Sequence, residues 1–176
     1  AVIKERRNGQ GAEVAGVTVE GKVAYLSLVQ LQAGVTWQKS HYTRPEKWSK
    51  DSSVPAEKRI FRTPDWYGYF TATYSPVKPL NIALSGTYTG SMIVQHMKGY
   101  IPKDIAVTTP DFFDMNLKIS YDFSLYKFIT LQLNAGIQNI FNAYQRDFDQ
   151  GKERDSGYIY GPSMPRSYFA GAKLMF

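Results

Sequence analysis

A strict two-residue alternation of apolar and polar side chains constrains this chain more than any other feature. In FITLQLNAGIQNIF, residues 128–141, polar or glycine residues separate the apolar side chains of Ile129, Leu131, Leu133 and Ile137. Successive side chains of a β-strand point to opposite faces of a sheet. The segment therefore predicts a strand with one apolar face and one polar face.

The same alternation recurs along the chain and predicts an all-β protein. Further segments that show it are residues 17–25, 29–38, 66–74, 80–91, 113–123 and 167–176. Together these make about seven strands of roughly nine to fourteen residues, longer than the ~5–6 residues usual in soluble sheets. A tilted strand of about nine to eleven residues crosses the hydrocarbon core of a membrane. The strand lengths therefore favour a membrane-spanning barrel.

The connections and the aromatic residues support the same interpretation. Short connections are expected near residue 27 and at 75–79 and 124–127, and long ones at 39–62, 96–111 and 142–163. Outer-membrane barrels sort short turns and long loops to opposite rims in this way, with the short turns in the periplasm. Aromatic side chains near strand ends predict interfacial girdles; they are Tyr25, Trp37, Trp66, Tyr74, Tyr88, Phe113, Phe123, Phe128, Phe141, Tyr168 and Phe176.

About seven strands do not close a bacterial barrel, which uses an even number and leaves no backbone edge in lipid. AVIKER, residues 1–6, is long enough only for the end of another strand. We therefore expect residues 1–176 to form an antiparallel transmembrane β-barrel segment, the C-terminal portion of a larger barrel. Two alternatives remain open at this point: a small complete barrel with a structural or adhesive role, and a soluble carbohydrate-binding β-sandwich.

Three stretches resemble TonB-dependent outer-membrane receptors. NIFN at 139–142, followed by Tyr144, resembles the end of the family's penultimate strand. YGPSMPRSYFAGAKLMF at 160–176 resembles its closing loop and last strand, and RTPDWYGYFTATYSP at 62–76 resembles a strand opener. The resemblance implies a 22-stranded barrel with a plugged lumen, of which this chain would supply the last seven or so strands. The plug domain, the N-terminal strands, the TonB box and the signal peptide would lie upstream of Ala1.

The resemblance also implies a function and a set of partners. The function is TonB-dependent uptake of a scarce nutrient across the outer membrane of a Gram-negative bacterium, such as a ferric siderophore, haem, cobalamin or a glycan. The implied partners are outer-membrane lipids and lipopolysaccharide, the plug and remaining strands, TonB through the N-terminal part, and a surface-exposed lipoprotein. No enzyme activity, cofactor or nucleic-acid partner is expected.

The predicted site residues fall into three groups. Aromatic residues of the long loops are expected to contact cargo or a surface lipoprotein: Tyr42, Trp48, Tyr100, Tyr158 and Tyr160. Charged residues of one strand are expected to face the lumen and the plug: Asp114, Lys118 and Asp122. One face of the last strand resembles a barrel-assembly signal: Tyr168, Ala170, Ala172, Leu174 and Phe176.

Two long loops carry the remaining charge signals. In RDFDQGKERDSG, residues 146–157, Asp147, Asp149 and Asp155 partly echo a calcium loop. Interleaved basic residues favour a salt-bridged external loop instead, so no metal site is expected. Residues 39–62 hold seven basic residues against three acids. We expect that segment to face an anionic partner, such as lipopolysaccharide phosphates or an anionic cargo.

Overall fold

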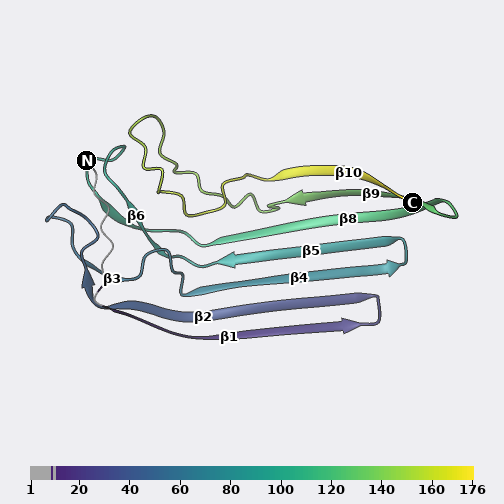
Figure 1. The fold of residues 1–176 in the computed structure, drawn as a ribbon, viewed down its shortest axis with the longest axis horizontal. Coiled ribbons are helices and arrows are strands. Elements are labelled where there is room, and N and C mark those ends of the chain that lie inside the picture. The colour runs from purple at the N-terminus through teal and green to yellow at the C-terminus, as the bar shows by residue number, and fades with distance from the viewer. Residues whose placement is uncertain (1–8, 10) are drawn as a thin grey trace.

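The computed structural model describes residue 9 and residues 11–176 as a curved β-sheet with loops gathered at one end (Figure 1). The predicted strand end at residues 1–6 lies outside the described residues. The strands are β1 (Ala12–Tyr25), β2 (Val29–Glu46), β3 (Glu57–Arg59), β4 (Trp66–Val77), β5 (Leu80–Thr89), β6 (Ile93–His96), β7 (Ile105–Thr108), β8 (Phe112–Tyr126), β9 (Ile129–Gln138) and β10 (Ser167–Met175). Within the described part of the chain, no helix is long and apolar enough to cross a membrane.

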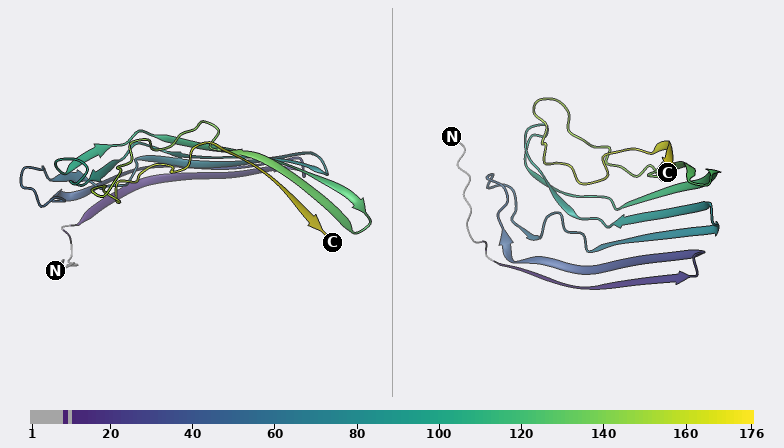
Figure 2. Two further views of the ribbon diagram at one scale, coloured as in Figure 1. Left: turned by 90° about the horizontal axis from the view of Figure 1, so that it is seen from above. Right: turned by 45° about the vertical axis from the view of Figure 1, so that its right-hand side comes forward.

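The main sheet is an antiparallel meander in the order β1-β2-β4-β5-β8-β9-β10, with β3 pairing onto β2. β6 and β7 form a separate hairpin. The sheet is one curved layer (Figure 2, left), so the alternative of a soluble β-sandwich is wrong. β1 and β10 each pair with one strand only among the described residues. The all-β antiparallel fold is confirmed, and these described strands alone do not close into a small barrel.

The register sorts the side chains of all seven long strands onto two faces. One aligned row runs across β1, β2, β4, β5 and β8 through Val19, Val35, Gly68, Tyr88 and Phe113. We call this side the apolar face. The row displaced by one residue on each strand runs through Glu20, Gly34, Tyr69, Thr87 and Asp114, and we call that side the polar face.

The apolar face exposes more contiguous apolar surface than is usual for a protein face in contact with water. Val19, Val23 and Leu133 keep 64%, 68% and 43% of their surface accessible, and no second layer of the described chain covers them. Contiguous exposed apolar patches of this extent mark an interaction with a membrane or another protein. A lipid bilayer would remove the whole apolar face from water.

Aromatic rings border the apolar face at both rims. On β4, Trp66 and Tyr74 lie eight residues apart, which is about 27 Å along a strand and about 20 Å across the sheet at a tilt near 40°. Trp37 lies beside Trp66 with the ring centroids 6.3 Å apart. Beyond Trp37 the same face turns polar, since His41 and Glu13 form an ion pair of 3.4 Å. The predicted girdles thus bound an apolar band.

The strand limits differ from the expected ones mainly at the long-loop rim. β2 continues to Glu46, inside the loop expected at 39–62, because the start of β1 and then β3 supply backbone partners beyond the apolar band. The β6–β7 hairpin lies mostly within the loop expected at 96–111. Its strands have only four residues each, too few to show an alternation.

We predict that a charge at the middle of the apolar face destabilises the barrel far more than the same charge on the polar face. Leu84→Arg places a guanidinium in the hydrocarbon band, at a cost of about 2–4 kcal/mol. Ser85→Arg, one residue along β5, projects from the polar face and should cost under about 1 kcal/mol. The unfolding midpoint of the purified barrel in detergent measures both, and equal losses would contradict the assignment of the faces.

Candidate functional site

Three long loops pack together at one rim and form what we call the loop cap, residues 47–65, 90–111 and 139–166 (Figure 1). The side chains with 7% exposure or less among those that the structure describes lie in it or at its base; they include Ile93, Val94, Phe112, Gln145 and Tyr158. The curved sheet is a single layer in the described part of the chain and has no comparable interior. The packed core of the described chain is therefore in its loops.

A histidine, a carboxylate and a tyrosine join two of these loops. The His96 ring stacks on the Tyr158 ring with centroids 3.7 Å apart and an interplanar angle of 8°. His96 Nε2 lies 2.9 Å from Asp149 Oδ2, and the two side chains are only 8% and 2% exposed. Asp149 Oδ2 also accepts a hydrogen bond from the amide of Asp155 at 2.9 Å. This cluster fixes the β6–β7 hairpin against residues 147–158.

Asp147 accepts hydrogen bonds from two tyrosine hydroxyls, Tyr158 at 2.8 Å and Tyr160 at 2.6 Å. Partial burial raises the pKa of Asp147, but the hydrogen bonds from Tyr160 and Tyr158 outweigh it, so the pKa is lowered overall. Burial, together with the facing carboxylate, raises the pKa of Tyr160 to about 12 and raises that of Tyr158 as well. Both phenols thus hold their protons as donors to Asp147.

The first loop of the cap is tied to the other two. Arg62 donates hydrogen bonds to the carbonyl of Ile159 at 2.7 Å and to that of Gly157. Its own amide donates to the carbonyl of Ile93 at 2.8 Å. Ser49 Oγ donates to Asp104 Oδ2 at 2.5 Å, which links the first loop to the second again. The cap is therefore a cross-braced unit rather than three independent loops.

The cap brings together only part of the aromatic set predicted to contact cargo. Tyr158 is 3% exposed and Tyr160 is half-buried, and both donate hydrogen bonds to Asp147. Trp48 packs against Phe61 with ring centroids 5.3 Å apart and donates to a loop carbonyl. Tyr42 is half-buried on β2, and Tyr100, at 56% exposure, is the most open of the five. Contact of these residues with cargo stays a prediction.

The three acids of the partial calcium echo are engaged by protein donors. Asp147 binds the two tyrosines, Asp149 binds His96, and Asp155 accepts from the amides of Met97 and Gly157. Within residues 9 and 11–176, no group of three or more histidine or acidic side chains could hold a metal ion. The contacts of these carboxylate oxygens with protein donors stabilise the folded loop instead.

The predicted lumen-facing charges lie on the polar face. The register places Asp114 and Lys118 of β8 there, opposite Thr87 and Ala83 of β5. Asp122, on the same side, accepts a hydrogen bond from Gln132 at 2.7 Å. Whether these charges contact a plug stays a prediction.

Asp114 also borders a recess that the sequence did not reveal. The recess has a volume of about 410 Å³, and residues 162–165 fold back over the polar face to form one wall. Asn116, Gln138 and Asn139 line it with Asp114, and the Asp114 Oδ1 atom is buried without a hydrogen-bond partner in the described chain. A buried carboxylate oxygen of this kind calls for a donor. No local pattern announces the recess, because its wall comes from a distant loop.

Four of the five residues of the proposed assembly signal lie on the apolar face of the sheet. Tyr168, Ala170, Ala172 and Leu174 of β10 align with Ile137, Ala135, Leu133 and Leu131 of β9 on the apolar face. Phe176 follows the end of β10 and is 92% exposed. Their role in assembly stays a prediction.

The sequence matches no protein-family model and no curated protein. Solved structures, however, share the fold. The ferric-catecholate import receptor Fiu of E. coli K12, in a closed form, has a TM-score of 0.64 and 20% identity over 93% of this chain and 21% of that chain. FpvAI, solved in complex with pyocin S2, has a TM-score of 0.62 and 15% identity over 93% of this chain and 19% of that chain.

This chain thus spans about a fifth of each of the two receptors. The likeness confirms the predicted fold, a segment of an antiparallel β-barrel.

We predict that Tyr158→Phe loosens the loop cap without disturbing the sheet. The variant keeps the ring stacked on His96 but removes one hydrogen bond to Asp147, worth about 1 kcal/mol because that carboxylate retains contact with solvent. Hydrogen exchange of residues 145–160 should quicken several-fold while β8 and β9 stay protected. Tyr100→Phe, in an exposed position of the neighbouring loop, is the control. An unchanged exchange rate would contradict the bracing role of Tyr158.

We predict that the cap loses stability as the pH rises from about 10 to about 12. In the unfolded chain Tyr160 ionises near its ordinary pKa of 10.0, and in the folded cap near 12. A group whose pKa is higher in the folded state than in the unfolded state stabilises the folded state at a pH below its unfolded-state pKa. This stabilisation is lost as the pH rises through its folded-state pKa. At the acid end, Asp147 contributes stability above its ordinary pKa of 3.8, which is lost as the pH falls below it.

Brief pulses of a protease active in alkali, from pH 8 to 12, measure this through cleavage at residues 151–157. Tyr160→Phe should reduce the alkaline rise in cleavage, and the raised pKa of Tyr158 accounts for the part that remains. A rise just as steep in that variant would show that another group controls it.

Proposed function

We propose that this chain forms part of the wall of a TonB-dependent outer-membrane receptor that imports a scarce nutrient into a Gram-negative bacterium. The observation that carries the proposal is the two-faced, open-edged sheet, together with its likeness over 93% of its length to the barrels of FpvAI and of the import receptor Fiu. The apolar face would contact outer-membrane lipids, and the polar face would line the lumen.

The edges of the sheet support a larger barrel. β1 and β10 each expose one row of backbone donors and acceptors among the described residues. In hydrocarbon each unsatisfied backbone group costs several kcal/mol, which only pairing with further strands removes. We propose that residues 1–176 are the C-terminal portion of a barrel of about 22 strands, with further strands closing it onto both edges.

The polar face supports a plug inside that barrel. It carries carboxylates, amides and lysines along its length, and the recess at Asp114 leaves a buried oxygen without a donor among the described residues. A domain filling the lumen would satisfy such groups. In this proposal TonB acts on the plug through the N-terminal part of the receptor, and this chain supplies the fixed wall.

The basic segment supports an anionic cargo. Residues 39–62 hold four net positive charges at the long-loop rim. Fiu, one of the two similar receptors, imports ferric catecholates, which are bulky anions. We therefore place a ferric chelate first among the candidate cargoes, ahead of haem, cobalamin and glycans. Tyr100, together with the exposed outer surface of the cap, would meet the cargo or a surface lipoprotein.

Uptake by cells tests the proposal. Cells that depend on the complete receptor should accumulate a labelled ferric catecholate, and deletion of the receptor or of TonB should lower accumulation at least ten-fold. Haem, cobalamin and an oligosaccharide, tested in parallel, identify the cargo class. Accumulation that persists without TonB, or a receptor absent from the outer-membrane fraction, would contradict the proposal.

A further inference from the structure

The strand β10 cannot take its register on β9 from a tight turn. Two or three residues join β1 to β2, β4 to β5 and β8 to β9, and turns of that length fix the register of a hairpin. β9 and β10 are joined instead by the long segment of residues 139–166. A slide of β10 along β9 by two residues would leave the apolar and polar faces unchanged. The alternation of side chains therefore permits more than one register here.

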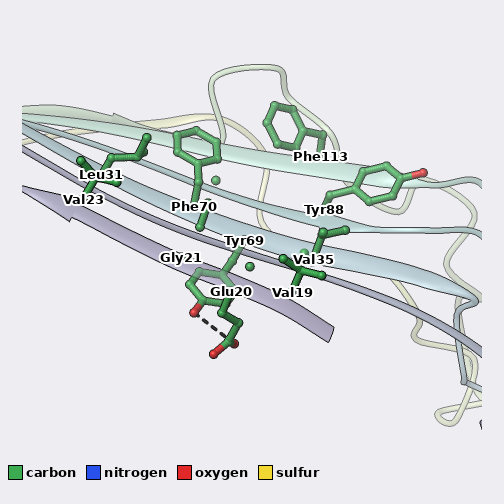
Figure 3. A pocket seen from close by; sticks show the side chains of 14 residues that line it. Val19, Glu20, Gly21, Val23, Leu31, Val35, Tyr69, Phe70, Tyr88 and Phe113 are labelled. Carbon is green, nitrogen blue, oxygen red and sulfur yellow. Dashed lines mark hydrogen bonds between the residues drawn. The ribbon is translucent and has the colours of Figure 1, made fainter. Parts of the chain in front are cut away.

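The side chains of β10 give its position on β9 limited support. Elsewhere in the sheet, contacts between side chains span three strands: Tyr69 of β4 donates a hydrogen bond to Glu20 of β1 (Figure 3). The centre of β10, residues 170–172, is Ala-Gly-Ala, and strands of such small residues hold their register weakly. Phe169 packs closely over Gly136 and gives one fixed point. A second fixed point lies at the start of β10.

Asn139, directly after β9, connects the beginning of the long segment to its end. It is 5% exposed and has a left-handed backbone with φ of 52°, which asparagine adopts more readily than most residues. Its Nδ2 donates hydrogen bonds to the carbonyls of Ala143 at 3.1 Å and Met164 at 3.0 Å. Its amide donates to Asn116 Oδ1 of β8 at 2.9 Å. Asn139 thus joins β8, the end of β9 and a residue just before β10.

Asn142 makes a second connection to the start of β10. Its backbone is also left-handed, with φ of 55°, and its amide donates to the carbonyl of Asn139 at 2.8 Å, so residues 139–142 form one turn. Its Oδ1 accepts a hydrogen bond of 2.9 Å from the amide of Arg166, the residue before β10. Arg166 and Met164 lie 24 and 25 positions along the chain from their asparagine partners. One turn therefore holds two particular backbone groups at the start of β10.

We propose that Asn139 and Asn142 form a register latch, which selects the position at which β10 begins to pair with β9. A slide of β10 by two residues would carry Met164 and Arg166 away from the two asparagines and break both connections. In the proposed receptor a further strand pairs with the other edge of β10, so the latch also sets the register in which the barrel closes. The inference rests on the barrel of the proposed function and is independent of cargo and of TonB.

Disulfide trapping in the complete receptor, freed of other cysteines, tests the latch. Ala135→Cys with Ala170→Cys joins residues that are aligned in the observed register, and Ala135→Cys with Ala172→Cys reports a slide by two residues. After oxidation, denaturing gels give the ratio of the second cross-link to the first even where the barrel folds in low yield. Asn139→Gly and Asn142→Gly keep the left-handed backbone accessible but remove the side-chain connections. Each should raise the ratio about five-fold or more, the effect of one lost hydrogen bond on an equilibrium.

Asn134→Ala is the matched control, because it removes an asparagine amide from β9 itself, opposite Gly171 of β10. Its cross-link ratio should equal that of the wild type. A wild-type ratio in both glycine variants would overturn the latch and leave the contact of Phe169 with Gly136 to fix the register alone. An equal rise in Asn134→Ala would overturn it as well. Either result would leave TonB-dependent uptake unaffected, whereas a receptor absent from the outer membrane would contradict the proposed function itself.

Discussion

Backbone hydrogen bonding in the absence of water is the constraint on which this structure depends. In hydrocarbon every N–H and C=O of a strand must pair with a neighbouring strand. The five inner strands of the meander satisfy both of their edges, whereas β1 and β10 satisfy one each among the described residues. The two faces follow from the same strand geometry. Successive side chains point to opposite sides of the sheet, so the apolar residues of each strand contact lipid on one side and the polar residues lie on the other.

The division of labour between sheet and loops follows from this arrangement. A sheet one layer thick has no interior, so its stability depends on lipid on one side and on polar contacts on the other. The loop cap, in contrast, is folded by its own protein contacts, with His96, Asp149, Tyr158 and Gln145 in its interior. Because Arg62 and Ser49 connect the first loop to the other two, movement of one loop would shift the others.

How much of this could be predicted depends on the range of the contacts. The strands and their faces were predictable, because the alternation is local and shows within each strand which side chains share a face. The cap was not, because its contacts join distant residues: His96 and Asp149 are separated by 53 positions, and Arg62 and Ile159 by 97. Tyr158 illustrates the limit. A tyrosine in an external loop suggests a contact for cargo, which stays a prediction, but no local pattern predicts that a carboxylate eleven residues away accepts its hydrogen bond inside the cap.

The strand glycines show how the sheet restores packing where a side chain is absent. Glycine weakens a strand unless something packs over it. Aromatic rings cover several here, with Phe70 over Gly86, Tyr69 over Gly34 and Phe169 over Gly136, each so close that a Cβ would collide. Such pairs fix the register and restore the lost packing. Gly21 has no such cover among the described residues, although it lies in the same aligned row as Gly86. Gly21 lies on β1, an edge strand of the described sheet, so a strand that pairs with this edge would also supply the cover for Gly21.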